Sequence, residues 1–119
     1  LDIVPSTANA LEICMGTTQT MTEGDIYDVL ATYSRKKAIA YVHFRNVRGQ
    51  VPEYREVFLD EGDIDMVRAI RAYREAGYDG VLIPDHVPHS ELDTPYNHRS
   101  HAFSYGYIRG LIDATEVMS

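Results

Sequence analysis

Three short hydrophobic runs, each ending on a side chain that can bind a metal ion, most constrain the fold of this 119-residue chain. The runs cover residues 11–14, 39–43 and 81–86, and they end on Cys14, on His43 and on the pair Asp85 and His86. They lack a clean period of two, which is typical of strands buried on both faces of a parallel sheet. Because the carboxyl ends of parallel strands meet at one edge, we expect a thiol, an imidazole and a carboxylate to share that edge.

Two amphipathic helices are predicted between the runs. Asp25 is the expected N-cap of the first, whose apolar stripe continues to Tyr33 and which ends at the basic run 35–37. Asp63 is the expected N-cap of the second, with Val67 on its buried face and Gly77 as the residue that follows its last turn.

A third helix is predicted over about residues 101–117. Phe103 is among the side chains expected to point inward. Gly106 and Gly110 weaken the helix, and their spacing of four residues favours close packing against another helix.

The order strand, helix, repeated three times, predicts an α/β fold with a parallel sheet and right-handed crossovers. Three strands are too few to close an eight-stranded barrel. We therefore expect residues 1–119 to form a single partial domain, about three βα units from the C-terminal portion of a TIM (β/α)8 barrel. The alternative is that the three-stranded sheet associates with more sheet. The stretches 16–24, 45–53 and 87–100 are expected to be irregular loops on the strand-to-helix side, where active sites lie.

Composition excludes several classes of partner. The net charge of −7 and a pI near 5.1 argue against binding to nucleic acid or to an anionic membrane. The basic run 35–37 is interpreted as the cationic last turn of a helix. One cysteine cannot form an internal disulfide, no stretch approaches the roughly 20 apolar residues of a membrane span, and the first residues lack the basic region of a signal peptide. We expect a cytoplasmic protein.

Each candidate ligand also has a purely structural interpretation. Cys14 could be a small buried hydrophobic residue, His43 a core histidine bound to a carbonyl, and Asp85 the cap of a turn. The small residues after Cys14, the polar pair that follows His43, and the imidazole of His86 favour a functional site instead. Thiolate, imidazole and carboxylate together allow manganese, iron(II), cobalt or zinc in an open catalytic site.

Several separate segments, in the same order, resemble the C-terminal part of the D-mannonate dehydratase family. They are residues 5–11 leading to 14–17, then 41–47, 56–63 and 84–88. The resemblance implies a xylose-isomerase-like TIM barrel that removes water from D-mannonate to give 2-keto-3-deoxy-D-gluconate in the breakdown of hexuronates. It also implies dependence on Mn²⁺ or Fe²⁺.

The resemblance further implies roles for individual residues. It implies that Cys14, His43 and Asp85 are metal ligands. It implies that His86 and Tyr96 are catalytic, with Tyr105 and Tyr107 as weaker candidates for the tyrosine. It also implies that Arg45, assisted by Asn46, contacts the substrate. The family's remaining metal ligand, a histidine on an earlier strand, has no counterpart in this chain.

Two other functions stay open at this point. One is a different divalent-metal isomerase or epimerase for sugars or sugar acids in the same superfamily, because a metal site can serve proton transfer without dehydration. The other is a catalytically silent barrel fragment with a role in oligomerisation. The expected partners are a small sugar-acid substrate and either further copies of the chain or the remaining part of the barrel.

Overall fold

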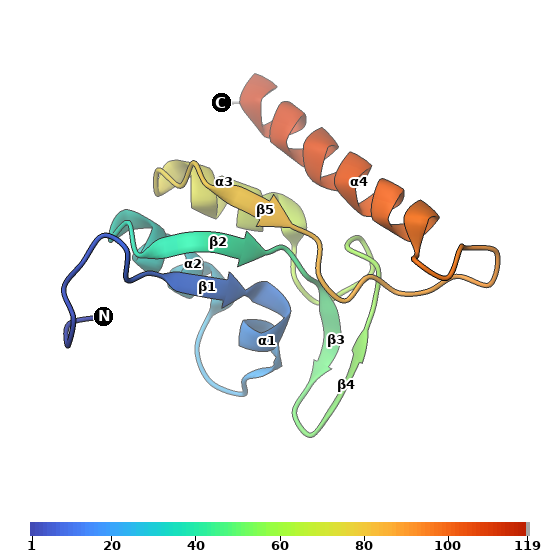
Figure 1. Cartoon of the computed structure of the whole chain (residues 1–119), viewed down its shortest axis with the longest axis horizontal. Coiled ribbons are helices and arrows are strands. Elements are labelled where there is room, and N and C mark those ends of the chain that lie inside the picture. The colour runs from blue at the N-terminus through green and yellow to red at the C-terminus, as the bar shows by residue number, and fades with distance from the viewer. Residues whose placement is uncertain (119) are drawn as a thin grey trace.

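The structure, a computed structural model, describes residues 1–118 and alternates strands with helices (Figure 1). In chain order its elements are β1 (Leu11–Cys14), α1 (Met15–Thr20), α2 (Ile26–Arg35), β2 (Ile39–His43), β3 (Val47–Gln50), β4 (Glu53–Glu56), α3 (Met66–Glu75), β5 (Val81–Ile83) and α4 (His98–Val117). No helix in this described part of the chain is long and apolar enough to cross a membrane.

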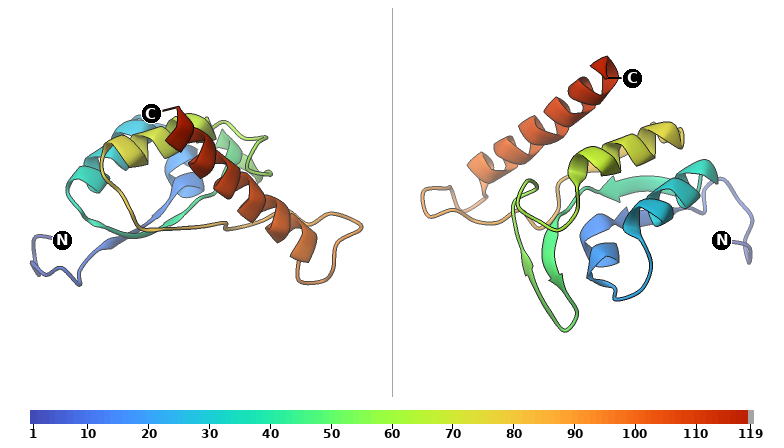
Figure 2. Two further views of the ribbon diagram at one scale, coloured as in Figure 1. Left: turned by 90° about the horizontal axis from the view of Figure 1, so that it is seen from above. Right: turned by 180° about the vertical axis from the view of Figure 1, so that it is seen from behind.

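The predicted parallel sheet is confirmed. Its strands lie in the order β1-β2-β5, and both neighbouring pairs run parallel. The register places Cys14 beside His43, and His43 beside Ile83. Helices α2 and α3 lie behind this sheet in Figure 1 and in front of it in the view from behind in Figure 2, so both cover the same face.

Alternate residues of the strands divide between a covered face and an open face. Ile13 and Val42 are buried against the helices, and Leu82 packs beside them. The opposite face carries polar residues and two exposed apolar ones, Val81 at 60% and Ile83 at 36%. The apolar runs predicted strands buried on both faces of the sheet. That prediction is wrong for residues 1–118, because the helices cover one face only.

Both predicted inner helices form, and one N-cap differs. Asp25 caps α2, its Oδ1 accepting from the backbone N of Tyr27 at 2.7 Å. Helix α3 is capped by Asp65 and not by Asp63, whose carboxylate instead accepts from the backbone N of Gly49 at 2.7 Å. Gly77 follows α3 with a φ of +78°, as predicted for a residue that ends a helix.

Helix α4 begins at His98, earlier than predicted, because a preceding loop residue caps it. The backbone N of Arg99 and that of Ser100 donate to the carboxylate of Asp93 at 2.9 and 2.8 Å. Asn97, the residue at the N-cap position, makes no capping hydrogen bond with its side chain. The first turn is therefore held from outside the helix.

Two side-chain placements and one packing prediction on the helices are wrong. Val67 is 39% exposed and Phe103 is 43% exposed, because α3 and α4 turn other faces toward the core. A methyl group added at Gly106 or Gly110 would meet nothing within 4 Å, so these glycines do not mediate close helix packing in the described chain.

All three stretches expected to be irregular contain regular structure, although 87–100 does so only where α4 begins at His98. Helix α1 follows β1 directly, and β3 pairs antiparallel with β4 in a two-stranded hairpin. The hairpin residues are mostly polar, so they show no apolar alternation that would reveal a strand. Both elements lie at the carboxyl end of the parallel sheet (Figure 1), beside the predicted site.

Candidate metal centre

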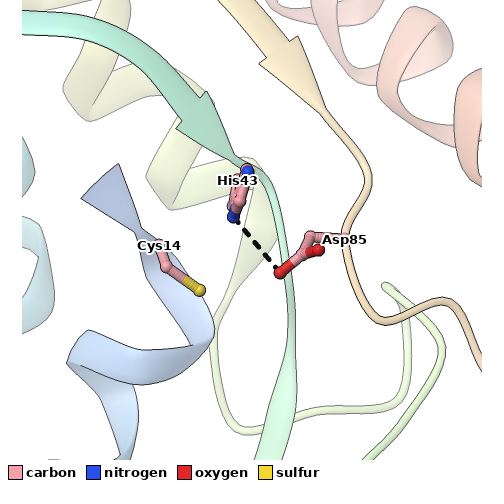
Figure 3. A group of neighbouring side chains, drawn as sticks. All are labelled: Cys14, His43 and Asp85. Atoms are coloured by element: carbon pink, nitrogen blue, oxygen red, sulfur yellow. Dashed lines mark ion pairs between the residues drawn. The ribbon is translucent and has the colours of Figure 1, made fainter. Parts of the chain in front are cut away.

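The three predicted ligands come together at one edge of the sheet. Cys14 ends β1, His43 ends β2, and Asp85 follows β5 by two residues. One ligand atom from each lies within 4.8 Å of the others, and all three residues are partly buried. Figure 3 shows the three side chains converging from these neighbouring strands. The prediction that they share an edge is confirmed.

A second carboxylate flanks His43 on the open face of the sheet. The Nδ1 atom of His43 lies 2.9 Å from Oε1 of Glu12 and 3.2 Å from Oδ2 of Asp85. The other oxygen of Glu12 accepts a hydrogen bond of 2.6 Å from the hydroxyl of Tyr41. This bond is the main reason that the pKa of Tyr41 is raised above its ordinary value. The Nδ1 atom of the imidazole thus faces two carboxylates.

A buried arginine lies beside Cys14. The Nη1 atom of Arg45 donates to Cys14 Sγ at 3.4 Å and to the hydroxyl of Thr17 at 3.2 Å. Its Nε donates to Glu56 at 2.9 Å, and its Nη2 makes a second, short bond to the same carboxylate. These bonds to Glu56 are the largest cause of a raised pKa for Arg45, so the guanidinium stays charged although it is only 5% exposed.

His86 lies next to the cluster, where its side chain is partly exposed to solvent. Its Nε2 is 3.4 Å from Asp85 Oδ2 and its Nδ1 is 3.9 Å from Glu56 Oε1, while the side chain is 56% exposed. The backbone of His86 has a φ of +51°, a left-handed conformation that costs a residue with a Cβ atom about 1–2 kcal/mol. Such strain is frequent at functional sites, because it aims a side chain in a required direction.

Asn46, expected to assist a substrate contact, is 1% exposed and bound to the protein's own backbone. Its side-chain nitrogen donates to the carbonyls of Leu59 and Ile64 at 2.8 and 3.0 Å. Its oxygen accepts from the backbone N of Val47 and of Ile64, both at 3.0 Å. A substrate could use this amide only if these bonds broke, so the geometry assigns Asn46 to the framework of the site.

The three candidate tyrosines lie on the loop before α4 or on α4 itself. Tyr96 is 77% exposed and Tyr105 is 56% exposed, whereas Tyr107 is partly buried with a pKa raised chiefly by that burial. Among residues 1–118, no hydrogen bond or ion pair joins any of them to the cluster. Tyr41, by contrast, reaches it through Glu12.

Glu12, Tyr41 and Glu56 belong to the site and were missed from the sequence. Glu12 and Tyr41 stand two residues before Cys14 and His43 on β1 and β2, so the strand period of two places them on the same face. That signal was available. Glu56 had no such signal, because its position depends on the pairing of β3 with β4.

The donor set fits a divalent cation. Thiolate, imidazole and carboxylate suit a first-row transition metal. Three carboxylates, those of Glu12, Glu56 and Asp85, stand against the single guanidinium of Arg45 around the cluster. A cation would balance this excess of negative charge.

Comparison with known proteins identifies the family. The family model described as D-mannonate dehydratase (UxuA) matches residues 1–119. The chain belongs to this family. The mannonate dehydratase of Lactococcus lactis subsp. cremoris (strain MG1363) is 28% identical over 123 residues, which cover 97% of this chain and 34% of that protein. Mannonate dehydratase 1 of Bacillus licheniformis is 30% identical over 121 residues, 96% of this chain and 32% of that protein.

A solved structure agrees in fold. The crystal structure of mannonate dehydratase from Streptococcus suis serotype2 superposes with a TM-score of 0.83 at 24% identity, covering 92% of this chain and 33% of that chain. The mixed α/β architecture with a parallel sheet is therefore shared with this mannonate dehydratase. The chain spans about a third of the length of the relatives that it matches.

Proposed function

We propose that this chain supplies part of a TIM barrel in a metal-dependent mannonate dehydratase, which removes water from D-mannonate to give 2-keto-3-deoxy-D-gluconate. The observation that carries the proposal is the convergence of Cys14, His43 and Asp85 at the carboxyl edge of the sheet, in a chain that belongs to the D-mannonate dehydratase family. The domain would be completed by more barrel, from the remainder of a longer chain or from a partner.

Cys14, His43 and Asp85 would hold Mn²⁺ or Fe²⁺. When bound, such an ion supplies positive charge that stabilises negative charge developing on the substrate's carboxylate side. The partial burial of the three ligands supports this role, because a site shielded from water strengthens electrostatic stabilisation.

The chain's own proton chemistry centres on His86. Removing a proton next to a carboxylate is difficult, and the departing hydroxyl needs an acid, because hydroxide is a poor leaving group. The His86 imidazole is half exposed next to the cluster, and its Nε2 lies near Asp85, so it can meet a substrate held at the cluster. In this proposal His86 and Tyr96 share proton removal and proton donation, and Tyr96 is 77% exposed in the loop before α4.

The substitution His86→Asn in the complete enzyme, with the rest of the barrel present, tests the proposal. We expect turnover of D-mannonate to fall about 10²- to 10⁴-fold, the usual contribution of a general acid or base, while bound metal is retained. His101→Asn is the matched control, because this histidine of α4 contacts the carbonyl of Asn97, the residue before the helix. Turnover near that of the unmodified protein in the His86 variant would refute the assignment.

Product analysis tests the reaction class. A 2-keto-3-deoxy acid formed from D-mannonate in the presence of Mn²⁺ would demonstrate loss of water. An isomer of mannonate that retains all its oxygen atoms would instead identify an isomerase or epimerase, and would overturn the dehydratase proposal.

A further inference from the structure

The contact between Arg45 and the sulfur of Cys14 suggests a role other than substrate contact. We propose that Arg45 is a positioning residue for the sulfur of Cys14, and that it tunes the affinity of the cluster for a divalent metal. This inference rests on the proposed role of Cys14 as a metal ligand.

The contacts of Arg45 define the arrangement. Nη1 reaches both the sulfur of Cys14 and the hydroxyl of Thr17, at 3.4 and 3.2 Å, so the guanidinium holds the residues where β1 passes into α1. Glu56 binds the other side of the guanidinium through two bonds. A planar group with fixed donor directions is thereby locked against rotation.

The start of α1 is shaped to admit this arginine. A Cβ atom built on Gly16 would lie 2.6 Å from Cδ of Arg45 and 2.8 Å from its Nε, closer than such atoms approach in proteins. Any larger residue at this position would displace the side chain from Cys14. Glycine, which weakens helices, is therefore used here to provide a channel for Arg45.

The charges around Arg45 suit a metal ligand better than a substrate anion. A coordinated thiol loses its proton, and a guanidinium donor stabilises the resulting thiolate through a charge-assisted hydrogen bond. Glu56 balances the arginine, so the bond to sulfur does not bring a net positive charge next to a divalent cation. Groups that bind and orient metal ligands in this way usually change metal affinity 10- to 100-fold when removed.

The exposed fraction of Arg45 distinguishes a contact with the substrate from a contact with the metal ligand Cys14. A contact with the substrate's carboxylate requires donors that open toward the substrate, whereas Arg45 is 5% exposed. Arg48, three residues after Arg45 and on strand β3 of the hairpin, is exposed and donates to the carbonyl of Glu61. Arg48 therefore provides a matched control that shares the side chain but lacks the contact with Cys14.

Binding of Co²⁺ to the protein provides a direct test, since cobalt bound to a thiolate has a charge-transfer absorption band. We expect Arg45→Gln to bind Co²⁺ roughly 10- to 100-fold more weakly. The band should move to longer wavelength, because the sulfur electrons lose a stabilising hydrogen bond. Arg48→Gln should match the unmodified protein in both measurements.

A second variant covers the risk that Arg45→Gln leaves the partly buried Glu56 without its arginine partner and destabilises the protein. The double variant Arg45→Gln/Glu56→Gln removes both charges together and should show the same shift of the band. Unchanged affinity and an unchanged band in these variants, with a raised KM for mannonate, would overturn the inference and identify Arg45 as a substrate contact.

The failure of the proposed metal site would look different. If the unmodified protein shows no thiolate band and Cys14→Ala binds Co²⁺ equally tightly, Cys14 is not a ligand, and both proposals are overturned. A normal band that is lost in Cys14→Ala but unshifted in the Arg45 variants would overturn the inference about Arg45 alone.

Discussion

Replacing Asn46 by alanine should destabilise the protein strongly. Four hydrogen bonds of 2.8 to 3.0 Å join this buried amide to the backbone of Val47, Leu59 and Ile64. A net contribution of about 1 kcal/mol for each bond predicts a loss of roughly 3–4 kcal/mol in the free energy of unfolding. The assay is urea unfolding followed by far-UV circular dichroism.

Two further variants show whether the hydrogen bonds cause the loss. Asn46→Asp keeps the shape and the two accepted bonds but cannot donate to the carbonyls, so it should cost at least about 2 kcal/mol. Asn9→Ala is the matched control, because this asparagine makes bonds on the surface, the shorter being 2.9 Å to the carbonyl of Val4. A cost below about 1 kcal/mol for Asn46→Ala would refute the reasoning. A higher KM in such a stable variant would support the substrate contact that the resemblance implies.

Two predictions concern the helix ends. Asp25→Ala removes the cap of α2 and should cost about 1 kcal/mol in urea unfolding, whereas Asp28→Ala in the first turn should cost only the interaction with the helix dipole, about 0.3 kcal/mol for an exposed carboxylate. Burial of Asp93 opposes its charge, but hydrogen bonds from Arg99, Ser100 and Thr94 outweigh this and hold its pKa well below the ordinary value. Its folded-state pKa is depressed, so its contribution to stability is present above about pH 4 and is lost as the pH falls toward the folded pKa. The free energy of unfolding, measured at several pH values, should fall at acid pH in the unmodified protein and fall less in Asp93→Asn. Equal dependence on pH in the two proteins would contradict this prediction.

The parallel sheet was predictable because its strands are short, apolar and followed by amphipathic helices. The N-cap of α3 was not, because Asp63 and Asp65 both precede the helix and the choice depends on a distant partner. Asp63 is used by the backbone of Gly49 in the hairpin, and Asp65 is left to cap the helix. Local pattern cannot show which of two equivalent carboxylates is already engaged elsewhere.

The convergence of the candidate metal ligands was more predictable than their surroundings. Ligands at strand ends follow from the topology alone, so Cys14, His43 and Asp85 were placed correctly at one edge. The contacts of Arg45 and Asn46 depend on more distant segments. The hairpin supplies Glu56 to Arg45, and the loop after β4 supplies the carbonyl of Leu59 to Asn46. Those contacts join residues more than ten positions apart, and no short-range pattern predicts them.

The open face of the sheet brings together two kinds of residue with different requirements. Glu12 and Tyr41 are polar: Glu12 contacts His43, and Tyr41 donates to Glu12, so this part of the face belongs to the candidate metal centre. Val81 and Ile83 are apolar and exposed on the same face, and each would gain free energy by being covered, at about 25 cal/mol for each Å² removed from water. Any layer that covered Val81 and Ile83 would have to pack on the β5 side and leave the β1 and β2 side polar and accessible. More strands of a closed barrel meet both requirements, because the interior of a small barrel is filled by side chains and its carboxyl end stays open to substrate.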